Sequence, residues 1–144
     1  MLFSRDDLTE LAGKSWIAVT TNGTVKKDGT ANMGRGNARE VAAKLPDIVS
    51  ELGRLLTENG NSVHYLGSMV FSFPVEETWL SYAELRLVER SAAQLLEQVD
   101  KRGIERITIP LPGCGKGGLK KADVLPVLEK YFDDRFIITE KEAQ

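Results

Sequence analysis

The chain has 144 residues, of which 42% are hydrophobic and 28% are charged, as is typical of a globular protein with one core-forming domain. Its 19 Lys and Arg residues are outnumbered by 21 Asp and Glu residues, and the formal net charge of −2 argues against a strong nucleic-acid surface. The single cysteine, Cys114, and the single histidine, His64, exclude an intrachain disulfide, a multi-cysteine zinc site and a histidine-based metal cluster, so neither a metal nor a cofactor is expected.

The first ten residues, MLFSRDDLTE, lack the basic start and long apolar core of a signal peptide. No apolar run approaches the length needed to span a membrane. We therefore expect a cytoplasmic protein without membrane contact, in which residues 1–144 form one domain.

The first half of the chain predicts strands that alternate with helices. Met1–Ser4 predicts a short edge strand, and the nearly continuous apolar run Trp16–Thr21 predicts a buried one. A glycine-bearing loop over 22–37 then leads into a helix at Ala38–Lys44. Pro46 ends that helix and suits the first turn of the next, Asp47–Glu58.

The second half repeats the alternation. The expected elements are strands at Ser62–Leu66 and Ser68–Phe73, a loop at Pro74–Trp79, a helix at Leu80–Arg102, a strand at Glu105–Leu111, a helix at Lys120–Phe132, a strand at Arg135–Thr139 and a frayed tail at Glu140–Gln144. Such alternation favours an α/β sheet that is covered by helices on both faces. Loops that follow strands and precede helices then lie at the carboxyl edge of the sheet, where such folds bind ligands.

A glycine-rich segment, Pro112-Gly-Cys-Gly-Lys-Gly-Gly-Leu119, lies between the predicted strand that ends at Leu111 and the helix that begins at Lys120. Glycines let backbone N–H groups approach an anion closely, and the start of a helix adds its positive dipole end. The segment therefore predicts a phosphate cradle. A turn that needs several positive φ angles is the alternative, but four glycines exceed what a turn requires.

Two common glycine-loop chemistries fit this segment poorly. A Walker A loop needs Gly-Lys followed by Ser or Thr, whereas Lys116 is followed by Gly117. A dinucleotide fingerprint matches Gly113, Gly115 and Gly118, with Glu140 roughly 20 residues further on. The motif nevertheless comes too late in the chain for the strands that normally follow it, so an NAD-binding domain stays a distant alternative.

Four segments together resemble the macrodomain family, an ADP-ribose-binding fold, over nearly the whole chain. They are Asp7-Leu-Thr9, Asn22, Met33-Gly-Arg-Gly-Asn-Ala38 and the glycine-rich segment described above. The resemblance implies a three-layer α/β/α fold with a mixed central sheet of about six strands. It also implies ADP-ribose, or an ADP-ribosylated macromolecule, as the ligand.

The resemblance assigns roles to particular residues. Asp7 is expected to bind the adenine amino group, Asn22 to face the distal ribose, and the two glycine loops to wrap the diphosphate. The ligand-binding set that it implies is Asp7, Asn22, Met33, Gly34, Arg35, Gly36, Asn37, Ala38, Gly113, Cys114, Gly115, Lys116, Gly117, Gly118 and Leu119. From the residues alone, Asp7 is better explained as a cap of the following turn and Asn22, before Gly23, as a turn residue. Lys116 is then an exposed charge and Cys114 a residue that fills a small space.

The two loop motifs resemble one branch of the family, which includes an antitoxin macrodomain that reverses DNA ADP-ribosylation and a hydrolase of glutamate-linked ADP-ribose. That branch carries Phe-Pro-x-Lys before a tryptophan, where this chain has Phe73-Pro-Val-Glu-Glu-Thr-Trp79. Glu76 thus replaces the catalytic lysine, and Gly117 stands where the hydrolase has an aspartate. The catalytic candidates are Asn22 and Glu76, with Glu76 as a general base. An ADP-ribose-directed hydrolase, acting on ADP-ribosyl groups or on ADP-ribose 1″-phosphate, and a non-catalytic ADP-ribose binder both remain open.

Overall fold

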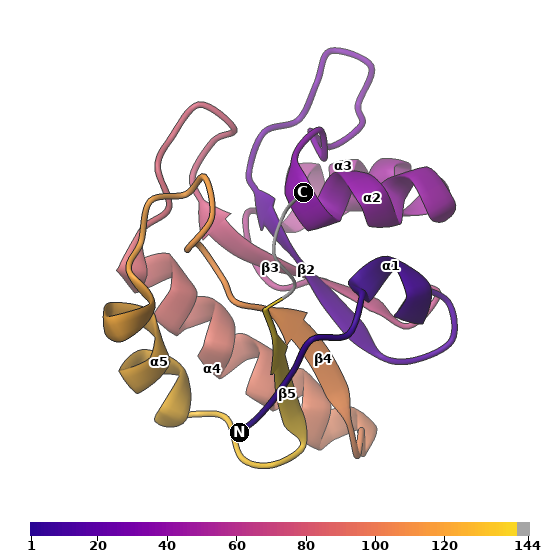
Figure 1. Ribbon diagram of the computed structural model, residues 1–144. Helices are drawn as coiled ribbons and strands as arrows, with labels where there is room; N and C mark the ends of the chain where they lie inside the picture. Colours follow the sequence, from indigo (N-terminus) through magenta and orange to yellow (C-terminus); the bar gives the residue numbers. More distant parts are fainter. Residues whose placement is uncertain (141–144) are drawn as a thin grey trace.

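The computed structural model describes residues 1–140, so the predicted tail beyond Glu140 lies outside the described residues. A five-stranded sheet in the order β1-β5-β4-β2-β3 forms the centre, and helices cover both of its faces (Figure 1). The strands are β1 (Leu2–Ser4), β2 (Ile17–Asn22), β3 (Val70–Glu76), β4 (Ile107–Pro110) and β5 (Phe136–Thr139). The helices are α1 (Leu8–Leu11), α2 (Gly36–Lys44), α3 (Asp47–Asn59), α4 (Leu85–Arg102) and α5 (Lys121–Glu129).

Two hydrophobic clusters, one on each face of the sheet, form the core. The central strand β2 supplies both, because successive side chains of a strand point to opposite faces. Ile17 and Val19 pack with the helices α1, α2 and α3, whereas Ala18 packs with α4 and α5. The expected three-layer α/β/α architecture is therefore confirmed, and burial on both faces explains why β2 is a nearly continuous apolar run.

The expected mixed sheet of about six strands is corrected by the structure. Within residues 1–140 the sheet has five strands, and every pairing between them is parallel. The predicted strand Ser62–Leu66 is reduced to one isolated antiparallel bridge between Tyr65 and Phe71. Side chains take the place of a ladder there, because the N–H groups of Val63 and His64 donate to side-chain oxygens at 3.0 and 2.9 Å.

The strand β3 lies further along the chain than its sequence predicts. Ser68 and Met69 adopt positive φ angles of 53° and 63°, so they belong to the preceding turn. At its other end the strand continues through Pro74, which an edge strand tolerates because one side of its backbone needs no partner. Glu76 is consequently the last residue of a strand, which fixes its backbone, and does not lie in a loop.

The helices differ in length and in apolar character. The 18-residue α4 carries charged residues in both of its end portions, between Arg86 and Arg90 and between Glu97 and Arg102. None of the helices in the described part of the chain combines the length and hydropathy required to span a bilayer.

Candidate functional site

Three connecting segments meet at the carboxyl edge of the sheet. Loop one (residues 23–35) follows β2, the bridging segment (residues 77–84) follows β3, and loop two (residues 111–120) follows β4. Because β4, β2 and β3 are neighbours and parallel, their carboxyl ends lie together, and the three segments rise from the same edge (Figure 1). The structure thus brings both predicted glycine loops to one place.

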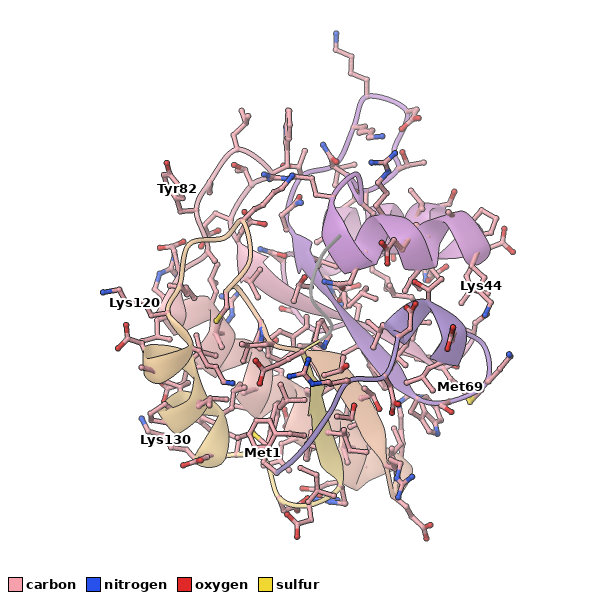
Figure 2. The ribbon with its side chains drawn as sticks, viewed as in Figure 1. Met1, Lys44, Met69, Tyr82, Lys120 and Lys130 are labelled. Atoms are coloured by element: carbon pink, nitrogen blue, oxygen red, sulfur yellow. The ribbon has the colours of Figure 1, made fainter. Side chains whose placement is uncertain are left out.

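The bridging segment holds on to both loops. The Trp79 N–H donates to Thr24 Oγ1 of loop one at 3.1 Å, and the Ala83 N–H donates to the Gly117 carbonyl of loop two at 3.1 Å. Between these anchors Leu80 and Tyr82 are 78% and 80% exposed, and Tyr82 points outward in Figure 2. The predicted helix from Leu80 therefore begins only at Leu85, because residues 77–84 span the gap between the loops.

Two of the four glycines in loop two, Gly113 and Gly117, leave no room for a side chain. Gly113 has a φ of +75°, and a Cβ at Gly117 would lie 2.7 Å from the Gly113 carbonyl oxygen and 2.8 Å from the Ala83 Cβ. A Cβ at Gly115, in contrast, would meet nothing within 4 Å. The backbone N–H groups of Gly115, Lys116 and Gly117 find no acceptor within residues 1–140. The same holds for the N–H groups of Gly113 and Cys114, so loop two presents five consecutive unused donors within the described part of the chain.

The start of α2 supplies a second set of donors. The first N–H groups of a helix have no carbonyl partner within it, and here they belong to Gly36, Asn37 and Ala38. Asn37 fixes this end on the sheet, since its Oδ1 accepts from the Thr20 N–H at 3.1 Å and its Nδ2 donates to Thr20 Oγ1 at 3.0 Å. Gly36, with a φ of +58°, makes the turn into the helix. The two sets of donors lie on loops that follow neighbouring strands.

Other residues of the predicted set serve the framework. The Gly34 N–H donates to Asn32 Oδ1 at 3.2 Å, so this amide is already used. The side chains of Met33 and Ala38 are buried in the core cluster of α1, α2 and α3. Leu119 folds over Gly113, and its N–H donates to the Gly113 carbonyl at 2.9 Å.

Asn22 braces loop one with both ends of its amide. Its Nδ2 donates to the Asn32 carbonyl at 3.1 Å, and its Oδ1 accepts from the Thr24 N–H at 2.9 Å. The side chain is nearly buried, with 9% of the residue exposed. Asn22 also lies beside Glu76 in the β2–β3 register, so the two predicted catalytic residues are neighbours. These bonds give Asn22 a structural role in the turn, which Asn before Gly23 also indicates in the sequence.

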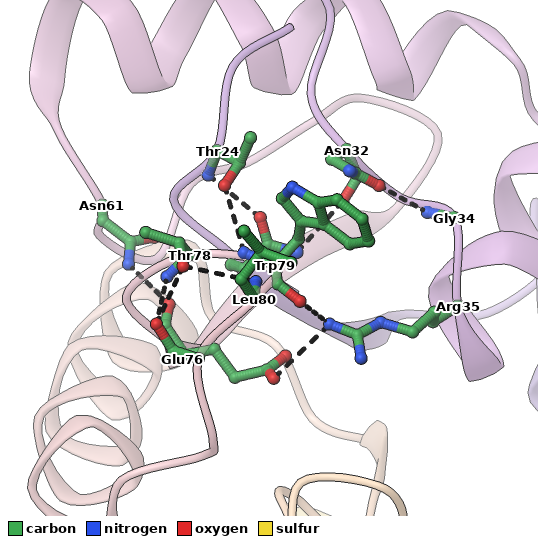
Figure 3. A network of polar contacts seen from close by, with 11 residues as sticks. Thr24, Asn32, Gly34, Arg35, Asn61, Glu76, Thr78, Trp79 and Leu80 are labelled. Carbon is green, nitrogen blue, oxygen red and sulfur yellow. Dashed lines mark hydrogen bonds and ion pairs between the residues drawn. The ribbon is translucent and has the colours of Figure 1, made fainter.

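Glu76 faces Arg35 across the gap between β3 and loop one (Figure 3). Arg35 Nη2 lies 3.8 Å from Glu76 Oε2, and the Glu76 side chain is only 16% exposed. Burial raises the pKa of this carboxyl, and the charge of Arg35 opposes that rise. Asn61 holds the strand end, because its Nδ2 donates to the Glu76 carbonyl at 3.0 Å.

Three further predicted residues occupy ordinary structural positions. Asp7 caps α1, where its Oδ1 accepts from the Thr9 N–H at 2.9 Å, and α1 packs against α2. Burial, followed by the charge of Glu140, raises the pKa of the half-buried Cys114 thiol, which opposes a nucleophilic role. Lys116 is exposed at the tip of loop two. No group of three or more potential metal ligands occurs within residues 1–140.

A hollow of about 580 Å³ lies away from these loops, at the amino edge of the sheet. Its lining includes Trp16, Met69 and Glu105, which precede β2, β3 and β4. It contains none of the residues that the sequence predicts for the site. The chemistry-bearing residues are therefore gathered at the opposite edge.

Three residues that support the site were not predicted. Asn32 captures the Gly34 amide, Thr24 anchors the Trp79 N–H, and Asn61 holds the Glu76 carbonyl. Asn and Thr beside glycine are general turn signals, so a local signal existed for Asn32 and Thr24. Their partners lie as far as 55 positions away, and no sequence pattern identifies such contacts.

Comparisons with known proteins agree with this architecture. No family model matches the chain. A DNA ADP-ribosyl transferase–DNA ADP-ribosyl glycohydrolase fusion protein of Thermosipho africanus (strain H17ap60334) is 26% identical in an alignment 133 residues long, with 75% of this chain and 34% of the fusion protein covered. The chain thus spans about a third of that relative's length.

Solved structures give the same result. The macrodomain of Mycobacterium tuberculosis DarG has a TM-score of 0.80 at 18% identity, with 98% of this chain and 97% of that chain covered. Thermosipho africanus DarTG in complex with ADP-ribose has a TM-score of 0.75 at 19% identity, with 100% and 43% covered. The macrodomain of Thermus aquaticus DarG has a TM-score of 0.68 at 22% identity, with 98% and 97% covered. The chain therefore has the macrodomain fold that its glycine motifs predicted.

Proposed function

We propose that this chain binds ADP-ribose, free or attached to a macromolecule, between loop one and loop two. The supporting observation is the pair of donor sets at one edge of the sheet, at the start of α2 and at residues 113–117. Backbone N–H groups on a glycine turn and at a helix start suit the two phosphates of a diphosphate. A solved neighbour of the same fold, DarTG of Thermosipho africanus, is described in complex with ADP-ribose.

We further propose an ADP-ribose-directed hydrolase in which Glu76 acts as a general base. In the hydrolysis, water forms a bond to C1″ of the distal ribose while the bond to the leaving group breaks and its electron pair departs with that group. Glu76 accepts the proton of the water. Burial raises the pKa of Glu76, and a more basic carboxylate is a better proton acceptor near neutral pH. The curated relative is named a DNA ADP-ribosyl glycohydrolase fusion, which makes ADP-ribosylated DNA the first substrate to test.

A non-catalytic binder is the second candidate, because the polar groups nearest the ribose position are occupied. The Asn22 amide is bonded at both ends within loop one, and the Glu76 carboxylate is paired with Arg35. A base must reach its water, and a paired carboxylate has to leave its partner first. In this case the chain recognises or sequesters ADP-ribose without turning it over.

Calorimetry with ADP-ribose, NAD and ATP tests the binding proposal. We expect ADP-ribose to bind more tightly than NAD or ATP. Tight binding of intact NAD with weak binding of ADP-ribose would favour the dinucleotide alternative, and no binding of any of the three would refute the proposed site.

A turnover panel separates the enzyme from the binder. The substrates are ADP-ribosylated DNA, protein carrying ADP-ribosyl-glutamate, and ADP-ribose 1″-phosphate, each tested with the wild type, Glu76→Gln and Glu76→Lys. If Glu76 is the base, the Gln variant should lose roughly two to four orders of magnitude in turnover. If Glu76 replaced a catalytic lysine, only the Lys variant should gain hydrolase activity. Unchanged turnover in both variants removes Glu76 from the mechanism, and no turnover in any form leaves the binder.

Two broader expectations remain proposals. Cell fractionation would test the cytoplasmic location. Calorimetry with unmodified DNA, alongside ADP-ribosylated DNA of the same sequence, would test the second expectation. From the net charge, we expect the unmodified DNA to bind weakly.

A further inference from the structure

Arg35 connects loop one to two other parts of the site. Its Nη2 lies 3.8 Å from Glu76 Oε2 at the end of β3, and the same nitrogen donates to the Trp79 carbonyl in the bridging segment. The guanidinium carbon also lies 5.8 Å from the centre of the Trp79 ring, within the range of a cation–π contact. Figure 3 shows the guanidinium between the Glu76 carboxylate and the Trp79 carbonyl.

Glu76 relies on Arg35 for its counter-charge. Within residues 1–140, Arg35 supplies the only cationic nitrogen within 4.0 Å of the Glu76 carboxylate. The charged groups next to it are committed elsewhere: Glu77 of the bridging segment and Glu84 before α4 both pair with Arg86. From β2 the neighbour is the uncharged Asn22, and loop two contributes the exposed Lys116. A poorly solvated carboxylate with one cation nearby depends strongly on that cation.

Arg35 also stands directly before the proposed diphosphate donors. It is the N-cap residue of α2, one position ahead of Gly36, so its long side chain is tethered at the place where the phosphates would lie. Guanidinium groups bind phosphate and carboxylate oxygens alike in a bidentate manner, and a diphosphate carries two negative charges where the carboxylate carries one. Two anions, the Glu76 carboxylate and an incoming diphosphate, would therefore compete for one cation.

We propose that Arg35 is an exchangeable strap, which holds Glu76 and the bridging segment in the free protein and transfers its guanidinium to the diphosphate when the ligand binds. Arg35 thereby acts as a positioning residue for Glu76, because the ligand itself frees that carboxylate. The proposal rests on the proposed function, since it takes ADP-ribose as the ligand. It also predicts that the bridging segment loosens around Trp79 on binding.

The exchange of Arg35 between Glu76 and the diphosphate links ligand binding to protonation of Glu76. In the free protein the charge of Arg35 lowers the pKa of Glu76 against the effect of burial. When Arg35 leaves and a diphosphate arrives, that opposing effect is lost and a negative charge is added, so the pKa of Glu76 rises. Binding then favours proton uptake, and the affinity for ADP-ribose should increase as pH falls from 8 to 5.

A double-mutant cycle tests the exchange. ADP-ribose affinity is measured by calorimetry for the wild type, Glu76→Gln, Arg35→Gln and the double variant. We expect Glu76→Gln to bind about 2- to 5-fold more tightly, because the intramolecular competitor is gone. Arg35→Gln should bind about 10-fold more weakly, because a charge-assisted contact is lost. In the Arg35→Gln background, the Glu76→Gln change should have a smaller effect than in the wild type. Glu76→Gln should abolish the pH dependence, and Arg35→Gln should reduce it, because the diphosphate charge still raises the pKa of Glu76 there.

Simple repulsion between Glu76 and the diphosphate predicts something different. It would make Glu76→Gln improve affinity equally in both backgrounds, and that result would overturn the strap. No improvement in either background would overturn it as well.

A second measurement needs no ADP-ribose. A Trp16→Phe background leaves Trp79 as the only tryptophan, so its fluorescence reports on the strap in the free protein. Arg35→Gln and Glu76→Gln should each shift or intensify the Trp79 emission, and unchanged emission in both would refute the strap. If ADP-ribose binds normally while these effects are missing, only the strap fails. If ADP-ribose does not bind at all, the proposed function fails, and the fluorescence result still decides whether the strap exists.

Discussion

Two substitutions in loop two should separate the stability of the fold from ligand binding. Gly117→Ala should lower stability, and Gly115→Val should weaken binding. Gly117→Ala introduces a Cβ that would lie 2.7 Å from the Gly113 carbonyl oxygen and 2.8 Å from the Ala83 Cβ. Neither neighbour is the end of a flexible side chain, so the backbone has to move. Such overpacking costs about 1–3 kcal/mol, which lowers the melting temperature of a chain of this length by roughly 3–10 °C.

Gly115→Val is the matched control for folding and the test for binding. A Cβ at Gly115 meets nothing within 4 Å, and its φ is not in the left-handed region. The free energy of unfolding should therefore change by no more than about 0.5 kcal/mol. The valine side chain would occupy the open side where a phosphate must approach the amides, so ADP-ribose affinity should fall roughly 10- to 100-fold, as expected for one lost charge-assisted contact.

Urea unfolding and calorimetry on the same preparations decide the outcome. If Gly115→Val binds ADP-ribose with wild-type affinity, loop two is not the phosphate-binding loop. Wild-type stability in Gly117→Ala would show that loop two is not packed against Ala83 as described.

Asn22→Ala should lower the free energy of unfolding by about 1–3 kcal/mol in urea, because the buried amide bonds the Thr24 N–H and a carbonyl of loop one; unchanged stability would confine Asn22 to ligand contact. Ser91→Ala should also cost about 1–3 kcal/mol, since the buried Ser91 Oγ donates to the Pro74 carbonyl at 2.6 Å, and thermal unfolding that matches the wild type would contradict this. Because the pKa of Cys114 is raised, iodoacetamide should label it more slowly than it labels glutathione at pH 7, and labelling should accelerate as the pH rises toward the pKa of the thiol. Labelling as fast as that of glutathione at pH 7 would rule out this environment.

The elements that the sequence predicted well are those whose signals are local. The apolar run Trp16–Thr21 became β2, and the helical spacing of Asp47–Glu58 became α3. Both depend on contacts with neighbouring layers that any α/β sheet provides. The two glycine loops were also placed correctly at the carboxyl edge, because strand, loop and helix follow one another directly in the chain.

The parts that were not predicted are those in which a backbone N–H group has two possible hydrogen-bond acceptors. The Gly34 amide was expected to face the ligand, but Asn32 captures it two residues away. The Val63 and His64 amides were expected in a strand ladder, but side chains from α4 and β3 accept their hydrogen bonds. Propensity does not distinguish such alternatives, since each satisfies the same donor.

The contact between Arg35 and Glu76 is a stronger example. Arg35 lies at the end of loop one and Glu76 at the end of β3, and their pairing follows from the strand order, in which β2 and β3 are neighbours. The replacement of lysine by Glu76 was visible in the sequence, and so was a cation in the glycine motif of loop one. Only the fold shows that Arg35 lies close enough to Glu76 to neutralise its charge.

The parallel order of the sheet has a consequence for how the chain folds. Parallel neighbours cannot be joined by a hairpin, so every pairing waits for a crossover to close, and longer crossovers close more slowly. The β4–α5–β5 unit is the most compact of these crossovers and is therefore the expected nucleus. The edge that contains β1 is the opposite case, because the bond from Thr139 Oγ1 to the Asp6 carbonyl joins positions 133 residues apart. Docking of β1 on β5 should thus be among the last events, and hydrogen exchange at this edge should be the fastest in the sheet.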